Sequence, residues 1–147
     1  MTSARQPRRM AGFELVLHRL EPPARVWQAL WDLDRHTAAI SLTRVGSCDG
    51  LPLRQGSEFV ARTGVGRIGF DDRMEVQAWD PPRQARIAKT GRVLRGSITV
   101  ELVADGAGTL VRWRQRFAVR GIPDVLARAA APVVALGYRV SLTRILG

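Results

Sequence analysis

The chain has 147 residues, of which 46% are hydrophobic and 24% are charged. This length suits one domain with a single core, and the composition is typical of a folded protein and excludes a disordered one. The formal net charge of +10 makes nucleic acid, an anionic membrane surface or an acidic ligand a candidate partner. Because Lys89 is the only lysine and arginine supplies the remaining positive charge, GC-rich codon usage explains the charge equally well, and charge alone assigns no partner.

The sequence also limits the compartment and the domain organisation. The single cysteine, Cys48, excludes an internal disulfide and a cysteine-rich zinc site. Charged side chains interrupt the apolar segment over residues 13–21, so no signal peptide is predicted. We expect a mobile basic tail over residues 1–12 and a single domain over residues 13–147. The uncharged stretch at residues 129–138 is shorter than the roughly 20 residues of a membrane span, so a cytoplasmic protein without a transmembrane segment is expected.

The first elements are a strand and two short helices. Alternating apolar and polar residues predict a strand over residues 13–20, and a Pro-Pro pair ends it. A helix follows, because proline is tolerated in a first helical turn and apolar residues recur at helical spacing through RVWQALWDL. A second short helix is predicted over residues 34–40.

A series of strands follows the two helices. Short runs rich in Val, Ile, Thr, Phe and Trp are separated by Gly, Asp-Gly and Asp-Pro turn signals. They predict strands at about residues 42–48, 57–63, 70–79, 84–90, 96–104 and 108–120. Together with the first strand, they make about seven antiparallel strands.

A long helix is predicted to close the chain, from Pro123 to residue 146. Proline and the following aspartate both suit a first helical turn, and Pro132 is expected to kink the helix. One apolar stripe at helical spacing consists of Leu126, Ala129, Val133, Leu136 and Val140. Small residues are expected where the helix approaches the sheet, namely Ala129, Ala130, Ala131, Ala135 and Gly137. They leave room either for a cavity or for close packing without one.

The last predicted strand, TLVRWRQRFAV, carries the densest arginines of the chain. In a strand, side chains alternate between two faces. One face would hold Arg112, Arg114 and Arg116, and the other would hold Val111, Trp113, Gln115, Phe117 and Val119. The same alternation in other strands places Glu75 and Glu101 among the arginines, and Met74, Val76 and Ala78 on the covered face. A stripe for nucleic acid would lack such carboxylates and would carry its aromatics beside its cations, so the pattern favours a solvent-facing surface and disfavours nucleic acid as a partner.

Gln115 is a polar side chain on the covered face, between Trp113 and Phe117. Burying an amide without a hydrogen-bond partner costs about 1–3 kcal/mol. The side chain must therefore either bond a neighbouring group or face a cavity that contains water or ligand.

Three stretches carry a resemblance to a known family. PPARVWQALWDLDRH is similar to an opening helix, MEVQAWDPPRQARI to a recurrent strand and turn, and GTLVRWRQRFAV to the closing strand before a long helix. With this order of elements, the chain from residue 13 to residue 146 resembles the START-like, or SRPBCC, superfamily, and its polyketide cyclase/dehydrase and lipid-transport branch in particular.

The resemblance implies an α+β helix-grip fold, in which a curved seven-stranded antiparallel sheet wraps around the long C-terminal helix and two short helices follow the first strand. It also implies a deep apolar cavity between the sheet and that helix. We expect the cavity to be lined by Phe59, Met74, Trp113, Gln115, Phe117, Val133 and Tyr138. Of these, Tyr138 has the least support, because it lies about 200° around the helix from Leu136 and so points away from the sheet if Leu136 faces it.

Few residues suit catalysis or metal binding. His18 in the first strand and His36 in the second short helix are the only histidines, and there is one cysteine, so a transition-metal site is not expected. No cofactor is expected either. Asp71 and Asp72 are neighbours in a strand and point apart, so they cannot act as paired carboxylates, and we expect them to pair with Arg67 or Arg73. No catalytic residue is assigned.

Two functions follow from these observations. The first is the binding of a hydrophobic or polycyclic small molecule, such as a polyketide, a lipid or a quinone-like compound, with cyclase or dehydratase chemistry left open. In a cyclase, Gln115 or Tyr138 would orient carbonyl groups. The second is a basic interaction module that docks on RNA or ribosomal surfaces. The sequence allows a monomer or a homodimer.

Overall fold

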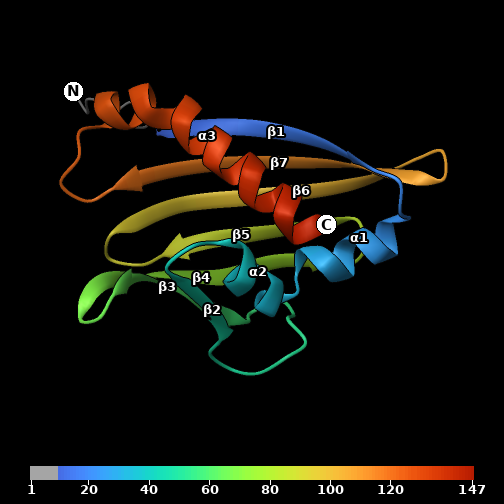
Figure 1. Ribbon diagram of the computed structural model, residues 1–147, viewed down its shortest axis with the longest axis horizontal. Helices are drawn as coiled ribbons and strands as arrows, with labels where there is room; N and C mark the ends of the chain where they lie inside the picture. The colour runs from blue at the N-terminus through green and yellow to red at the C-terminus, as the bar shows by residue number, and fades with distance from the viewer. Residues whose placement is uncertain (1–9) are drawn as a thin grey trace, which may run out of the picture.

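Seven antiparallel strands form one curved sheet, and the last helix lies across its concave face (Figure 1). The computed structural model describes residues 10–147. The strands follow the spatial order β1-β7-β6-β5-β4-β3-β2. In chain order the elements are β1 (Ala11–Arg19), α1 (Pro23–Leu30), α2 (Leu33–Ala39), β2 (Thr43–Ser47), β3 (Glu58–Val65), β4 (Ile68–Asp80), β5 (Gln84–Thr90), β6 (Leu94–Asp105), β7 (Gly108–Val119) and α3 (Asp124–Leu146). The predicted helix-grip fold is confirmed.

The start of the sheet differs slightly from the prediction. β1 begins at Ala11, two residues before the predicted strand, so residues 11 and 12 belong to the sheet and not to the tail. The remainder of the predicted basic tail, residues 1–9, lies outside the described residues. The Pro-Pro pair opens α1 as expected, with Pro22 at the N-cap and Pro23 at the first helical position.

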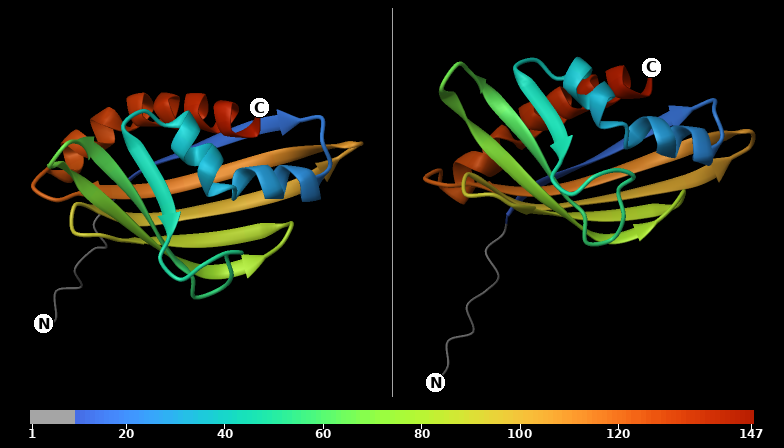
Figure 2. Two further views of the ribbon diagram at one scale, coloured as in Figure 1. Left: turned by 60° about the horizontal axis from the view of Figure 1, so that its bottom comes forward. Right: turned by 90° about the horizontal axis from the view of Figure 1, so that it is seen from below.

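The three helices lie on one face of the sheet, and the other face carries no helix within residues 10–147 (Figure 2). Strands β2 to β7 pair with their chain neighbours, whereas β1 pairs with β7 from Ala11 opposite Phe117 to Arg19 opposite Thr109. The first and last strands are therefore neighbours, and the covered face is where the core and any internal site must lie.

β7 alternates as predicted, with Val111, Trp113, Gln115 and Phe117 buried. On its outer face, Arg112 and Arg114 each lie 3.3 Å from a carboxylate oxygen of Glu14, and Arg112 lies 3.8 Å from Glu101. Arg112 and Arg114 therefore belong to a network of opposite charges, as expected for a solvated surface.

β4 departs from the predicted alternation. Its register with β5 shifts between Val76 and Ala78, which is the signature of a β-bulge. The prediction that Ala78 faces the core is therefore wrong, because the bulge leaves Ala78 exposed and turns Trp79 partly inward. The Trp79 ring lies 4.8 Å from the Trp27 ring and 5.2 Å from the Trp31 ring, between ring centroids.

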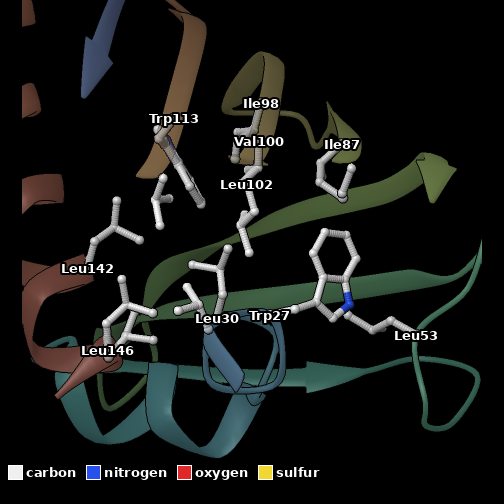
Figure 3. Packing of buried hydrophobic residues seen from close by; sticks show 14 of the residues in the cluster. Trp27, Leu30, Leu53, Ile87, Ile98, Val100, Leu102, Trp113, Leu142 and Leu146 are labelled. Atoms are coloured by element: carbon white, nitrogen blue, oxygen red, sulfur yellow. The ribbon is translucent and has the colours of Figure 1, made fainter. Parts of the chain in front are cut away.

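The main core fills the space between the sheet and the helices (Figure 3). Trp27 and Leu30 of α1 and Leu142 and Leu146 of α3 contribute to the same buried cluster as Val100, Leu102 and Trp113 of the sheet. Leu30 is fully buried, although α1 has only eight residues. Burial of these apolar side chains, at about 25 cal/mol per Å², holds the short helices in place, since such helices are marginal in isolation.

α3 packs on the sheet with the face opposite the predicted apolar stripe. Leu126, Val133 and Leu136 are 58%, 74% and 62% exposed. The buried residues of the helix are Ala127, Ala131, Leu142, Ile145 and Leu146. Among the small residues expected against the sheet, Ala131 and Ala135 point inward, whereas Ala129, Ala130 and Gly137 are exposed.

The length and composition of α3 are those of a helix that could cross a membrane. Because its inner face packs on the sheet, these properties are weak grounds for assigning a membrane span. The feature that distinguishes α3 is that most of its apolar surface lies outside the core.

We predict opposite effects for alanine at two glycines. Gly96 has φ +144°, and a Cβ atom there would overlap the Arg116 carbonyl oxygen. Gly96→Ala should therefore lower the free energy of unfolding by at least about 2 kcal/mol. Gly137 lies in α3 with open space around it, so Gly137→Ala should raise the free energy of unfolding by about 1 kcal/mol. Urea denaturation measures both changes, and equal effects at the two positions would contradict the described backbone.

Candidate functional site

A cavity of about 80 Å³ lies between the sheet and the C-terminal half of α3. Its walls come from strands β2 to β7, from α2 and from the inner face of α3. Seven polar or amphipathic side chains line it: Trp31, His36, Asp72, Lys89, Trp113, Tyr138 and Ser141. Larger surface hollows, such as the one lined by Arg19, Arg25 and Arg35, are lined largely by charged and polar side chains. In contrast to these surface hollows, the cavity under α3 is recessed and mostly apolar.

A buried ion pair spans two strands in the wall of this cavity. The Lys89 ammonium of β5 donates a hydrogen bond of 2.5 Å to Asp72 Oδ2 of β4. The two side chains are only 2% and 9% exposed. Each charge would be costly to bury alone, and the partner makes both tolerable.

Lys89 keeps its charge in this setting. Burial alone would lower the pKa of the Lys89 ammonium, but the neighbouring Tyr138 and Asp72 side chains outweigh burial by charge and hydrogen bonding, and the pKa is raised. The cavity therefore contains a fixed cation next to a carboxylate and a phenol.

Two buried polar atoms at the cavity have no hydrogen-bond partner within residues 10–147. One is Asp72 Oδ1, an acceptor, and the other is Trp31 Nε1, a donor. Leaving such a group unpaired costs about 1–3 kcal/mol. A ligand that presents a donor to Asp72 and an acceptor to Trp31 would remove both costs.

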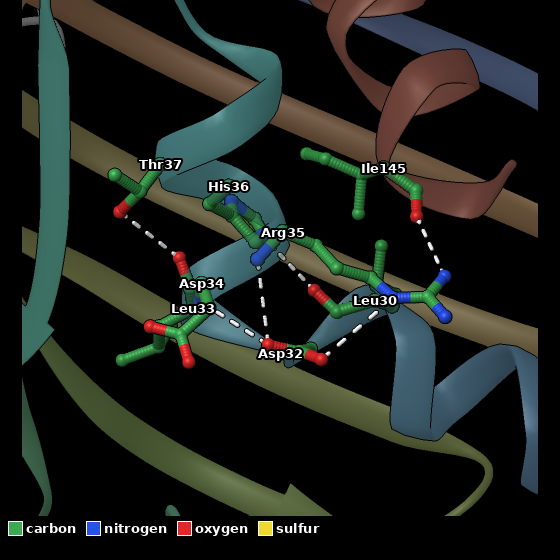
Figure 4. A network of polar contacts seen from close by, with 8 residues as sticks. All are labelled: Leu30, Asp32, Leu33, Asp34, Arg35, His36, Thr37 and Ile145. Carbon is green, nitrogen blue, oxygen red and sulfur yellow. Dashed lines mark hydrogen bonds and ion pairs between the residues drawn. The ribbon is translucent and has the colours of Figure 1, made fainter.

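Polar contacts tie the end of α3 to the α1–α2 connection (Figure 4). Arg35 Nη1 donates to the Ile145 carbonyl oxygen at 3.1 Å, and Arg35 Nε lies 3.7 Å from the Asp32 carboxylate. Asp32 also caps α2 by accepting backbone N–H groups of its first turn. His36 Nε2 lies 2.6 Å from the Leu30 carbonyl oxygen, so the neutral imidazole carries its proton on Nε2. These contacts fix the side of the cavity that α2 forms.

Four of the seven residues expected at the cavity lie on its wall: Phe59, Met74, Trp113 and Tyr138. Tyr138 points toward the sheet, since its ring centroid lies 5.4 Å from that of Phe13 and 6.2 Å from that of Trp113. The orientation inferred from Leu136 is corrected, because Leu136 is on the outer face. Whether these four residues contact a ligand remains a prediction.

The other three expected residues do not line the cavity. Gln115 is buried, and its Oε1 accepts a hydrogen bond of 3.1 Å from Trp113 Nε1, so it bonds a neighbour rather than facing the cavity. Phe117 belongs to a separate small cluster with Ala127 and Ala131. Val133 is exposed because α3 turns its opposite face to the sheet, and its predicted place in the cavity is wrong.

Asp72 and Lys89 were missed as site residues, although a local signal existed. Asp72 lies two and four residues before the buried Met74 and Val76, so it shares their covered face of β4. Lys89 lies two and four residues after the buried Ile87 and Ala85, so it shares their covered face of β5. The expected partners of the acidic pair were wrong. Asp71 bonds Arg62 at 3.2 Å on the exposed face, and Asp72 bonds Lys89 on the covered face.

The described residues contain no group of three or more His, Cys, Asp or Glu side chains that could hold a metal ion. His18, the other histidine, is exposed and lies 3.7 Å from Asp105. The acidic and basic side chains on the cavity wall are Asp72, Lys89, Tyr138 and His36.

Comparison with known proteins extends these findings. Residues 21–145 match the family described as "Polyketide cyclase / dehydrase and lipid transport". No curated protein matches the chain in sequence.

Solved structures share the fold at low sequence identity. Ara h 8.0201 is similar with a TM-score of 0.72 and 15% identity, over 94% of this chain and 96% of that one. TTHA0849 from Thermus thermophilus has a TM-score of 0.71 and 17% identity, over 92% and 93%. The Zhui aromatase/cyclase from Streptomyces sp. R1128 has a TM-score of 0.68 and 20% identity, over 94% and 92%. At these identities the likeness shows the fold alone.

We predict that removing one member of the buried pair is far more costly than removing both. Asp72→Asn leaves a buried, uncompensated ammonium and should lower the free energy of unfolding by about 3–5 kcal/mol, whereas Asp72→Leu combined with Lys89→Met should stay within about 2 kcal/mol of the wild type. The matched control is Asp71→Asn, which removes an exposed ion pair worth at most about 1 kcal/mol. Urea denaturation distinguishes the three, and a loss for Asp72→Asn as small as that of the control would contradict the prediction.

We also predict a pH dependence from His36. Burial lowers the pKa of His36 below its ordinary value of 6.5, against opposing contributions from the Leu30 hydrogen bond and the Asp32 charge. Below pH 6.5 the imidazole of His36 takes up a proton in the unfolded chain but not in the folded chain. The free energy of unfolding should therefore decrease as the pH is lowered, until the pH reaches the pKa of His36 in the folded chain. Across about pH 5 to 8 the wild type should lose more stability on acidification than His36→Gln. Parallel curves for the two proteins would refute this assignment.

Proposed function

Because the chain belongs to the polyketide cyclase/dehydrase and lipid-transport family, we propose that it binds a hydrophobic small molecule in the cavity under α3, with the polar group of that molecule held at Asp72 and Lys89. The observation that carries the proposal is the unpaired Asp72 Oδ1 beside the charged Lys89 ammonium in a mostly apolar cavity. Small-molecule sites combine an apolar lining with a few such convergent polar groups.

The unpaired groups describe the polar part of the ligand. Asp72 Oδ1 would accept a hydrogen bond from a hydroxyl group, and Trp31 Nε1 would donate one to a carbonyl or hydroxyl oxygen. The apolar part of the ligand would contact the ring of Phe59 and the side chains of Ile87 and Ile98. A hydroxylated aromatic or polyketide-like compound fits these requirements better than a plain hydrocarbon.

The size of the cavity limits what it holds without rearrangement. Its volume of about 80 Å³ is smaller than a cavity of about 150 Å³ that accommodates benzene. The cavity therefore admits a small fragment as it stands, and a polycyclic ligand would require α3 or α2 to move outward. The outer face of α3 has no packing partner within residues 10–147 that opposes such a movement.

The same polar groups would support proton transfer. Asp72 could accept a proton from a position next to a ligand carbonyl, while Lys89 and Tyr138 stabilise the negative charge that develops on the carbonyl oxygen. Cyclase or dehydratase chemistry would use such a proton acceptor together with groups that stabilise the negative charge on the carbonyl oxygen. Binding is the primary proposal, and catalysis is its extension.

Docking on RNA or ribosomal surfaces has less support. Of the three β7 arginines that would form a phosphate-binding stripe, Arg112 and Arg114 are engaged by carboxylates, with Glu14 between them. The aromatic residue between them in sequence, Trp113, is buried on the other face of the strand.

We predict selective binding of hydroxylated rings. In titrations followed by NMR, p-cresol should bind the wild type about tenfold more tightly than toluene, which is nearly the same size but cannot satisfy Asp72. In the Asp72→Leu/Lys89→Met variant the preference for p-cresol should fall well below tenfold, to what the Trp31 Nε1 donor alone contributes. Because p-cresol and toluene are both larger than benzene, binding of either already requires the cavity to widen, and 2-naphthol and a hydroxyanthraquinone would require it to widen further.

A bulky substitution provides the control for the location of the site. Ile98→Trp should fill the cavity and abolish binding, whereas Val103→Trp, also on β6 but 51% exposed, should leave it unchanged. Absence of binding of every probe at millimolar concentration, or full binding by Ile98→Trp, would reject the proposed site.

A further inference from the structure

The outer face of α3 is apolar where a surface helix is expected to be polar. Val125, Leu126, Val133, Leu136 and Val140 expose 44–74% of their surface. No charged residue occurs over residues 129–138. A helix that packs on a sheet by one face normally carries polar side chains on the other. α3 is apolar on both faces, so its outer face has the composition of a surface that binds a partner.

The border of this apolar face is positively charged. Residues 120–147 contain four arginines and a single acidic residue, Asp124. In the part of the chain that the structure describes, Arg120, Arg139 and Arg144 form no ion pair with a carboxylate. The outer face of the sheet differs, since Arg112 and Arg114 there meet the carboxylates of Glu14 and Glu101. The outer face of α3 is therefore apolar and has a positively charged rim. At these three arginines of the rim, no carboxylate neutralises the charge.

We propose that the outer face of α3 docks on the surface of an anionic lipid bilayer. The helix would lie in the plane of the interface, with its exposed aliphatic side chains between headgroups and acyl chains and its arginines on lipid phosphates. It would not span the bilayer, because its inner face packs on the sheet through residues such as Leu142 and Ile145. The chain's net charge of +10 adds to the attraction.

A second copy of the chain fits this face less well. Antiparallel pairing of two α3 helices centred on Val133 would set Arg128 of one copy beside Arg139 of the other, on the same edge of the pair. The two-fold symmetry would repeat this like-charge contact at the other end of the same edge, and such contacts are destabilising. A bilayer that contains anionic lipid instead offers the opposite charge to the arginines of the rim.

Docking would place the cavity against the lipid. The helix that presents Leu136 and Val140 outward presents Tyr138 and Leu142 to the cavity wall. An apolar compound dissolved in the bilayer would thus be separated from the cavity by one helix. The docking proposal does not depend on ligand binding, and either can fail without the other.

Flotation of the full-length protein with lipid vesicles tests the proposal. Vesicles of phosphatidylcholine with about 30% phosphatidylglycerol should bind the wild type at least about tenfold better than vesicles of pure phosphatidylcholine at about 0.1 M salt. Val133→Ser/Leu136→Ser should reduce binding at least about tenfold. The matched control, Val65→Ser/Ile68→Ser, removes two apolar residues of similar or greater exposure from the β3–β4 hairpin and should bind as the wild type does.

A second pair of variants tests the charged rim. Arg139→Gln/Arg144→Gln should reduce binding about fivefold for each arginine removed. Arg54→Gln/Arg67→Gln makes the same change in net charge away from α3 and should alter binding by less than about twofold. Unfolding in urea confirms that each variant is folded.

Several outcomes would overturn the proposal. They are equal binding to neutral and anionic vesicles, no binding to either, and equal losses in the α3 variants and their controls. Sedimentation velocity tests the alternative partner. If the wild type is a dimer and Val133→Ser/Leu136→Ser is a monomer, the outer face of α3 binds a second copy of the chain and the lipid proposal is overturned.

Discussion

The concave face of the sheet is wider than any single helix can cover. Seven strands at a spacing of about 4.8 Å extend over about 29 Å, whereas a helix with its side chains is about 10–12 Å across. α3 therefore covers one part of the face, and α1 and α2 close another. The cavity lies where these helices meet the sheet, so its position follows from the geometry of the layers.

Within that cavity, stability and function make different demands. A buried ion pair is commonly no more stabilising than apolar residues of similar volume. The Lys89–Asp72 pair thus contributes a fixed arrangement of charge more than it contributes stability. With one carboxylate oxygen unpaired, the arrangement is incomplete within the described residues, and this incompleteness supports a binding site over a purely structural role.

Local patterns were sufficient for the strands, apart from the bulge that exposes Ala78 in β4, and insufficient for the site. Alternation and turn signals predicted the strands and the buried face of β7, because both depend on neighbouring residues. The pairing of Asp72 with Lys89 depends on the register that sets Met74 opposite Lys89, which no local pattern encodes. The orientation of α3 was equally beyond local reasoning: the helix has two apolar faces, and only packing of Leu142 and Ile145 against the core selects one of them.

The indole rings add an optical consequence. Trp27, Trp31 and Trp79 form a mutual cluster, with ring centroids 4.8–5.8 Å apart, and Trp31 also reaches the cavity wall. Chromophores this close and held at fixed angles couple their electronic transitions, which gives the folded chain its own near-ultraviolet circular dichroism. A guest that displaces Trp31 would change that coupling, so the protein carries an intrinsic spectroscopic reporter of cavity occupancy that needs no label.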